Sequence, residues 1–150
     1  MKKSLKYFYI FTPIVLGAGI GLITKNGMDY NIITKPPLSP PSFLFPIVWS
    51  ILYLNMGISY YILKNNNEIN ENLDKLYYGQ LVVNLIWPIL FFTFKLRLLS
   101  SIWIILLDIL VTIMVYKFYK KNKAIGYLNI PYLIWVLFAT YLNIAIYVLN

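Results

Sequence analysis

The apolar residues of this chain form five long blocks, each of which contains at most one charged residue. Each block is close to the ~20 residues that an α-helix needs to cross a bilayer. The segments between the blocks are too short to fold as a separate soluble domain. The pattern therefore predicts an all-α membrane protein, a bundle of five transmembrane helices that occupies residues 1–150 as one domain. The predicted spans are 7–24, 43–63, 76–94, 98–116 and 124–149.

The connection between the first two blocks is rich in proline. Residues 35–53, KPPLSPPSFLFPIVWSILY, contain four prolines within residues 36–41 and continue without a break into an apolar helix that carries Trp49. Proline has no N–H to donate, and lipid cannot solvate an unpaired backbone group. This connection must therefore lie at the membrane interface or pack on the protein. We expect it to form a proline-rich lid on the helix bundle.

Polar and aromatic residues within the blocks recur at helical spacing. Residues three or four apart share one face of a helix, and polar side chains in a membrane span should face the bundle interior. Three aromatic faces with a few amides are typical of a pocket for a large flat apolar ligand. The same residues also suit helix–helix hydrogen bonds and interfacial aromatic belts, so both interpretations stay open. The three sets are Trp49, Tyr53, Met56 and Tyr60; Gln80, Asn84, Trp87 or Pro88, and Phe91; and Tyr132, Trp135, Ala139 and Asn143.

The first block has two interpretations. Three nearby lysines and the small residues at 17–19 also fit a cleaved signal peptide. Against this, Pro13, Gly17 and Gly21 share one helical face, and small residues at this spacing let helices approach closely within lipid. We expect the segment to be retained as the first helix.

Composition and charge agree with a membrane protein. The chain is 60% hydrophobic and 12% charged, with a net charge of +8. Five crossings place nine basic residues on the side of the N-terminus and four on the other side. The positive-inside rule then predicts a cytoplasmic N-terminus, an external C-terminus and an external lid. Because the basic residues set orientation, no nucleic-acid partner is expected.

Missing residue types narrow the possible chemistry. The chain has no Cys and no His, which excludes disulfides, thiol catalysis, zinc sites built on these residues and hydrolytic triads. No metal site is expected. Asp108 is the one acidic residue within a predicted span, so paired-carboxylate catalysis in the membrane is excluded as well. A carboxylate at that depth indicates either a functional group or a hydrogen-bonded helix contact.

Three sequence motifs resemble the TspO/MBR family of translocator proteins, formerly called peripheral benzodiazepine receptors. They are the KPxxxPP connection leading to FPIVWSILY, then QLVVNLIWPILFF, and PYLIWVLFATYLN, in this order over nearly the whole chain. The resemblance implies a five-helix bundle, often a homodimer, in the cytoplasmic membrane of a bacterium. It implies a porphyrin-like tetrapyrrole as a small-molecule ligand, with no cofactor, bound between the first loop and the helices.

The resemblance also implies which residues contact a ligand. By position they are Tyr30, Trp49, Gln80, Asn84, Trp135 and Ala139, and the helical stripe adds Trp87. The leading hypothesis is a membrane receptor or sensor. An alternative is light- and oxygen-dependent porphyrin breakdown, with Trp49 and Trp135 as redox-active catalytic neighbours. A second alternative is a transporter, although the chain shows no internal repeat of the kind that alternating access uses.

Two positions depart from the family pattern. Leu38 stands where members usually carry Trp between the lid prolines, and Asp29 stands where an aromatic residue commonly precedes Tyr30. We expect the loss of two rings either to weaken tetrapyrrole binding through the lid or to change the preferred ligand, and a ring restored at position 38 to strengthen porphyrin binding. The animal cholesterol motif needs a basic residue after Tyr141, and none follows Lys123, so cholesterol is not the expected ligand.

Overall fold

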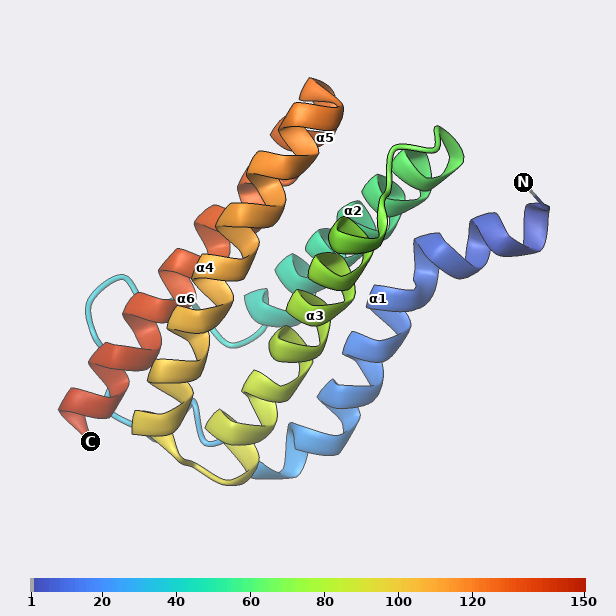
Figure 1. Cartoon of the computed structure of the whole chain (residues 1–150). Helices are drawn as coiled ribbons and strands as arrows, with labels where there is room; N and C mark the ends of the chain where they lie inside the picture. The colour runs from blue at the N-terminus through green and yellow to red at the C-terminus, as the bar shows by residue number, and fades with distance from the viewer. Residues whose placement is uncertain (1) are drawn as a thin grey trace.

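The computed structural model describes residues 2–150, and every regular element in that range is a helix (Figure 1). Five helical units are long and apolar enough to cross a membrane, namely Lys3–Gly27, Leu44–Asn65, Glu71–Thr93, Arg97–Lys121 and Lys123–Leu149. The predicted all-α, five-span architecture is confirmed. The elements are α1 (Lys3–Thr24), η1 (Lys25–Gly27), α2 (Leu44–Asn65), α3 (Glu71–Pro88), η2 (Ile89–Thr93), α4 (Arg97–Lys121), α5 (Lys123–Leu128) and α6 (Ile130–Leu149).

The third helix begins earlier than the hydrophobic pattern predicts. Asn70 caps it, because its side-chain oxygen accepts a hydrogen bond from the backbone N–H of Leu73 at 2.8 Å. Glu71 and Asp74, expected in a loop, lie in the first turn of α3, where acidic side chains favour the positive end of the helix dipole. The hydrophobic pattern misses this turn because it lies outside the apolar block.

Two of the predicted spans are interrupted at prolines. Pro88 ends the regular part of α3, and residues Ile89–Thr93 continue as a π-helix in which the Phe94 N–H bonds the Ile89 carbonyl at 3.0 Å. In the fifth span α5 ends before Asn129, and α6 starts with Pro131 in its first turn. Both units remain single membrane-crossing spans, Glu71–Thr93 and Lys123–Leu149, with a local irregularity near each proline.

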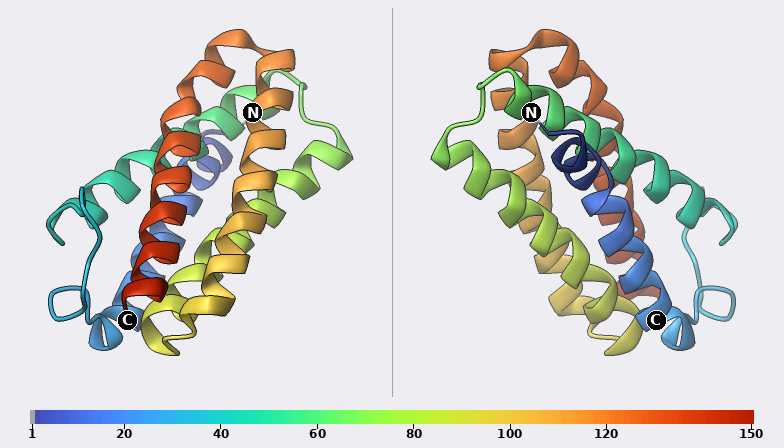
Figure 2. Two further views of the ribbon diagram at one scale, coloured as in Figure 1. Left: turned by 90° about the vertical axis from the view of Figure 1, so that its left-hand side faces the viewer. Right: turned by 90° about the vertical axis from the view of Figure 1, so that its right-hand side faces the viewer.

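The helices form an elongated bundle whose two ends differ. Helix α1 packs against α2, and α4 packs against α3 and α6 (Figure 1). The N-terminus, the α2–α3 connection and α5 gather at one end, while the C-terminus, the α1–α2 connection and the α3–α4 turn gather at the other (Figure 2). We call residues 28–43, between η1 and α2, the lid segment.

Helix α1 is fitted to α2 at glycines. A Cβ on Gly57 of α2 would clash with the carbonyl oxygen of Ile10, so only glycine allows this crossing. Gly17 similarly makes room for the ring of Tyr53, which an added Cβ would overlap. At Gly21 nothing lies within 4 Å of such an atom. The α1–α2 seam is therefore tight near the N-terminal end and open toward the lid segment.

The tight end of the bundle is filled by tyrosines. The rings of Tyr60 and Tyr77 stack with centroids 4.3 Å apart, and Tyr9 meets Tyr60 edge to face at 5.2 Å. Tyr60 also donates a hydrogen bond to Asp74, which ties α2 to the first turn of α3. Aromatic rings thus fill this half of the bundle, and a large cavity lies in the half beneath the lid segment.

Candidate ligand-binding site

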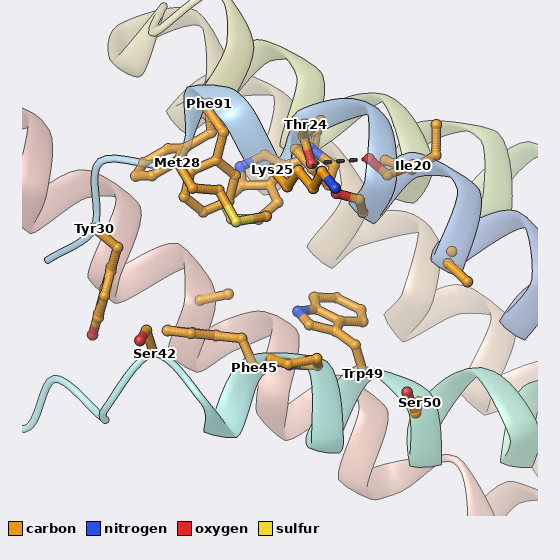
Figure 3. A pocket seen from close by; sticks show the side chains of 18 of the residues that line it. Ile20, Thr24, Lys25, Met28, Tyr30, Ser42, Phe45, Trp49, Ser50 and Phe91 are labelled. Carbon is orange, nitrogen blue, oxygen red and sulfur yellow. Dashed lines mark hydrogen bonds between the residues drawn. The ribbon is translucent and has the colours of Figure 1, made fainter.

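A cavity of about 710 Å³ lies between α1, α2 and the lid segment, with its inner wall formed by α3, η2 and α6 (Figure 3). Its walls are mainly aromatic and aliphatic. Phe45, Trp49 and Tyr53 reach it from α2, whereas Phe91 and Phe92 reach it from η2. In Figure 3 the side chains of Phe91 and Met28 lie opposite those of Phe45 and Trp49. The space between the two walls suits a flat apolar molecule.

The structure places Tyr30 in the lid segment at the edge of this cavity. Its hydroxyl donates a 2.6 Å hydrogen bond to the Pro40 carbonyl, and its side chain is 7% exposed. The Lys35 ammonium lies 5.0 Å from the ring centroid and donates to the Tyr30 carbonyl at 2.8 Å. Burial raises the pKa of the Tyr30 hydroxyl, so the residue is a neutral donor at physiological pH. These contacts fold the proline-rich segment around Tyr30.

Other contacts fasten the lid segment to the bundle. The Asp29 carboxylate accepts a 2.6 Å charged hydrogen bond from Arg97 at the start of α4, and both side chains are nearly buried. Tyr141 of α6 donates to the Pro37 carbonyl at 2.7 Å. The side chain of Asn150 bonds both the N–H and the carbonyl of Thr34, at 3.1 and 2.8 Å. The lid segment is thus held at α4 and at the end of α6.

The two amides predicted on the third helix lie beside the cavity rather than on its surface. Neither Gln80 nor Asn84 lines it. Asn84 accepts from Tyr53 at 2.5 Å and donates to Tyr132 at 2.8 Å. Tyr132 in turn donates to Gln80 at 2.6 Å, and the Gln80 amide donates to the Tyr77 carbonyl at 2.9 Å. This network joins α2, α3 and α6, which favours the helix-contact interpretation of the amide stripe.

Trp87 and Ala139 both line the cavity, on the side of α3 and α6. The Trp87 indole N–H donates to the Asn143 side chain at 2.7 Å, and Asn143 donates to Ser101 of α4 at 2.7 Å. Trp87 is therefore held by its N–H while one surface of its ring borders the cavity. Ala139 is 5% exposed, and its small side chain leaves room beside the ring.

Of the two tryptophans predicted to act together, Trp49 lines the cavity and Trp135 does not. Trp49 is half-buried in the cavity wall and stacks on Tyr53 with centroids 5.4 Å apart. Trp135 lies behind Phe45, at a centroid distance of 5.9 Å, and borders a groove on the outer side of α2 and α6. Its indole N–H is buried without a partner among the described residues. A ligand in the cavity would touch Trp49 directly and reach Trp135 only through Phe45.

The two residues that depart from the family pattern, Leu38 and Asp29, lie in different surroundings. Leu38 is 83% exposed, has a left-handed backbone with φ 69°, and does not line the cavity. The expected contact between a ring at this position and a ligand is therefore corrected, because the turn directs position 38 away from the cavity. Asp29 gains the ion pair with Arg97, whose guanidinium lies 4.7 Å from the ring centroid of the cavity residue Phe91.

Asp108 is a contact between helices and does not line the cavity. Its carboxylate accepts a 2.6 Å hydrogen bond from Thr140 and so joins α4 to α6. Its second oxygen is buried without a partner among the described residues. Within residues 2–150 no group of three or more acidic, His or Cys side chains could hold a metal ion.

The sequence did not predict that α1, η1 and the start of the lid segment contribute to the cavity. Ile14, Gly17, Gly21, Lys25 and Met28 all border the cavity. The glycine face of α1 was visible in the sequence, but small residues suggest close helix packing rather than a cavity wall. Lys25 appeared only as one of the charges at a helix end.

Five helices that can span a membrane, arranged around an aromatic cavity, define a multi-pass integral membrane protein of a receptor-like kind. The chain belongs to the TspO/MBR family, whose model matches residues 9–149. It is 41% identical over 144 residues to the tryptophan-rich protein TspO of Archaeoglobus fulgidus, covering 94% of each chain. It is 29% identical to the tryptophan-rich sensory protein of Cereibacter sphaeroides, covering 89% of this chain and 84% of that one. It is 30% identical to the translocator protein of Bos taurus, covering 76% of this chain and 70% of that one.

Proposed function

We propose that this protein is a membrane receptor or sensor that binds porphyrin-like tetrapyrroles in the cavity beneath the lid segment. The observation that carries this proposal is the aromatic-walled cavity of about 710 Å³. Its volume falls within the ~300–1,000 Å³ of typical small-molecule sites. A flat macrocycle would lie between the wall that contains Trp49 and the wall that contains Phe91, with Tyr30 at one edge. The names of relatives, tryptophan-rich sensory protein among them, support a sensory role.

The contacts of the lid segment support a binding role. Tyr30, Asp29 and Pro37 are each held by specific hydrogen bonds, so the cavity rim is organised before a ligand arrives. Preorganisation of this kind lowers the entropy cost of binding. The aromatic walls supply apolar contact area with little loss of side-chain freedom.

Light- and oxygen-dependent porphyrin breakdown is the second candidate function, and the surroundings of Trp49 favour it. This ring borders the cavity and contacts two further oxidisable rings, Tyr53 at 5.4 Å and Tyr132 at 6.4 Å between centroids. In this reaction the porphyrin would absorb light, dioxygen would be the oxidant, and Trp49 would be an oxidisable side chain in direct contact with the cavity. Trp135 would act only from behind Phe45.

A titration with protoporphyrin IX tests both functions. Binding in the dark should quench tryptophan fluorescence to a saturating level at one porphyrin per chain, whereas unsaturable quenching would contradict the receptor proposal. Illumination in air then separates binding from breakdown, because breakdown removes the porphyrin absorption band. We expect Trp49→Phe to slow any bleaching more than the matched Trp135→Phe does. Equal effects of the two variants would remove the special role of Trp49.

A further inference from the structure

We propose that Lys25 recognises an acidic group of the ligand at the mouth of the cavity. The ligand class is then an apolar, flat molecule with a carboxylate at one edge, rather than a fully neutral one. This inference rests on the proposed function and deepens it, because it names the chemical group by which one ligand would be preferred over another.

The cavity lining carries a positive charge at one residue. Among residues 2–150, Lys25 is the one charged residue that lines the cavity, and the remaining lining is apolar except for a few hydroxyl and amide groups. No acidic side chain lines the cavity. A single positive charge in an otherwise apolar lining complements a single negative charge on a bound molecule.

Lys25 differs from the other basic residues at this end of the bundle. Arg97 is paired with Asp29, and the Lys35 ammonium donates to the backbone carbonyls of Tyr30 and Ile33. Lys95 does not line the cavity. Lys25 makes no ion pair or side-chain hydrogen bond with any of residues 2–150, so its ammonium group is available to a ligand.

Lys25 lies at the mouth of the cavity. Lys25 directly follows α1, on the same side of the cavity as Met28 and opposite Phe45 and Trp49 (Figure 3). Lys25 is itself exposed, and Leu22, three residues earlier on the cavity wall, is 66% exposed, so the cavity opens at the end of α1. A ligand can therefore place its apolar body between the aromatic walls and keep its carboxylate at the water boundary. A charged group at this boundary avoids the desolvation cost that it would have deeper in the cavity.

An acidic ligand group near the end of α1 would need a positive charge beside it. The last carbonyls of a helix carry a partial negative charge and repel an anion. The Lys25 ammonium offsets that repulsion at the point where the ligand's acid would lie. Removal of the positive charge should therefore weaken the binding of acids, while neutral ligands of the same shape should bind as before.

The test compares two porphyrins with one ring system, protoporphyrin IX and its dimethyl ester, in the dark. Wild-type protein should bind the diacid more tightly than the ester. Lys25→Gln should weaken diacid binding about two- to five-fold and leave ester binding unchanged, as expected for an exposed charge pair. Lys25→Glu should weaken it further. The matched control Lys95→Gln removes a lysine from the same end without touching the cavity, and should change neither affinity.

The outcomes separate this inference from the function on which it rests. Equal affinity of wild-type protein for the two porphyrins would overturn the role of Lys25 while leaving porphyrin binding intact. A loss of both affinities in Lys25→Gln would also overturn it, because the effect would then be structural. If neither porphyrin bound wild-type protein saturably, the proposed function would fail, and this inference with it.

Discussion

At the scale of single residues, the polar side chains of α3 form hydrogen bonds with side chains of other helices. Gln80 and Asn84 are 0% and 2% exposed, and each has hydrogen-bond partners from neighbouring elements. A buried amide with satisfied bonds fixes the register of helices around it, whereas a ligand-binding amide needs a free donor or acceptor facing the cavity. The network therefore shapes the cavity by holding Tyr53 and Tyr132 in place.

Asn84→Ala should destabilise the fold. The substitution removes the acceptor for the buried Tyr53 hydroxyl and a donor to Tyr132, so the free energy of unfolding should fall by about 1–3 kcal/mol. Unfolding of the detergent-solubilised protein measures this change. Asn66→Ala, at an exposed amide beyond α2, is the control and should change stability little. Weaker porphyrin binding at unchanged stability would show that Asn84 faces the ligand after all.

Part of this residue-level picture follows from the sequence. Helical spacing correctly places Trp49, Gln80, Asn84 and Ala139 on inward faces, because polar and aromatic groups avoid lipid. Spacing does not tell whether an inward face meets a cavity or another helix. That depends on how far neighbouring helices lie apart, as the open space at Gly21 shows.

At the scale of elements, the lid segment is stabilised by ties to helices distant in the sequence. The Asp29–Arg97 ion pair joins it to α4, and its two side chains are only 12% and 13% exposed. A charge pair at this depth is costly to break, because the remaining partner stays in a poorly solvated place. The other ties, from Tyr141 and Asn150, are neutral hydrogen bonds near the surface.

Asp29→Asn should loosen the lid segment. It removes the charge that pairs with Arg97, and the free energy of unfolding should fall by about 1.5–3 kcal/mol, with faster porphyrin release. Stopped-flow dissociation and denaturant unfolding measure the two effects. Lys75→Gln is the control, since it breaks the exposed Glu71–Lys75 pair and should change neither quantity measurably. An equal effect of both substitutions would show that the Asp29–Arg97 pair stabilises the protein no more than an exposed ion pair does.

The sequence predicts the spans themselves well, because an uninterrupted run of ~20 apolar residues is typical of a membrane-crossing helix and of little else. It predicts the breaks at Pro88 and Pro131 poorly. Proline within an apolar block permits a kink, a π-turn or a helix start, and the choice depends on which neighbours satisfy the freed carbonyls. The lid's tie to α4 was equally hidden, because Asp29 and Arg97 are 68 residues apart.

At the scale of the whole molecule, the two ends of the bundle differ in charge. Nine basic residues belong to the end with the N-terminus, and four to the end with the lid segment and the C-terminus. From this asymmetry the positive-inside rule predicts that the first end lies in the cytoplasm. The cavity mouth at Lys25 would then face the outside.

A reporter fused after Asn150 tests this orientation. Alkaline phosphatase, which needs an oxidising compartment, should be active there, and a fluorescent protein that folds only in the cytoplasm should be dark. The same pair inserted in the α2–α3 connection, at the other end of the bundle, should give the reverse pattern. A bright fluorescent protein and an inactive phosphatase after Asn150 would contradict the predicted topology.

The most direct test of the central claim fills the cavity without disturbing the bundle. A Cβ at Gly21 meets nothing within 4 Å, and Gly21 lines the cavity, so Gly21→Leu should occupy ligand space at little cost to folding. Gly19→Leu is the matched control, because Gly19 is on the same helix, also has open space, and does not line the cavity. We predict that the dark affinity for protoporphyrin IX falls at least ten-fold, by ~1.4 kcal/mol or more, in Gly21→Leu and is unchanged in Gly19→Leu. Wild-type affinity in both variants would show that porphyrin binds elsewhere or not specifically, and would contradict the account.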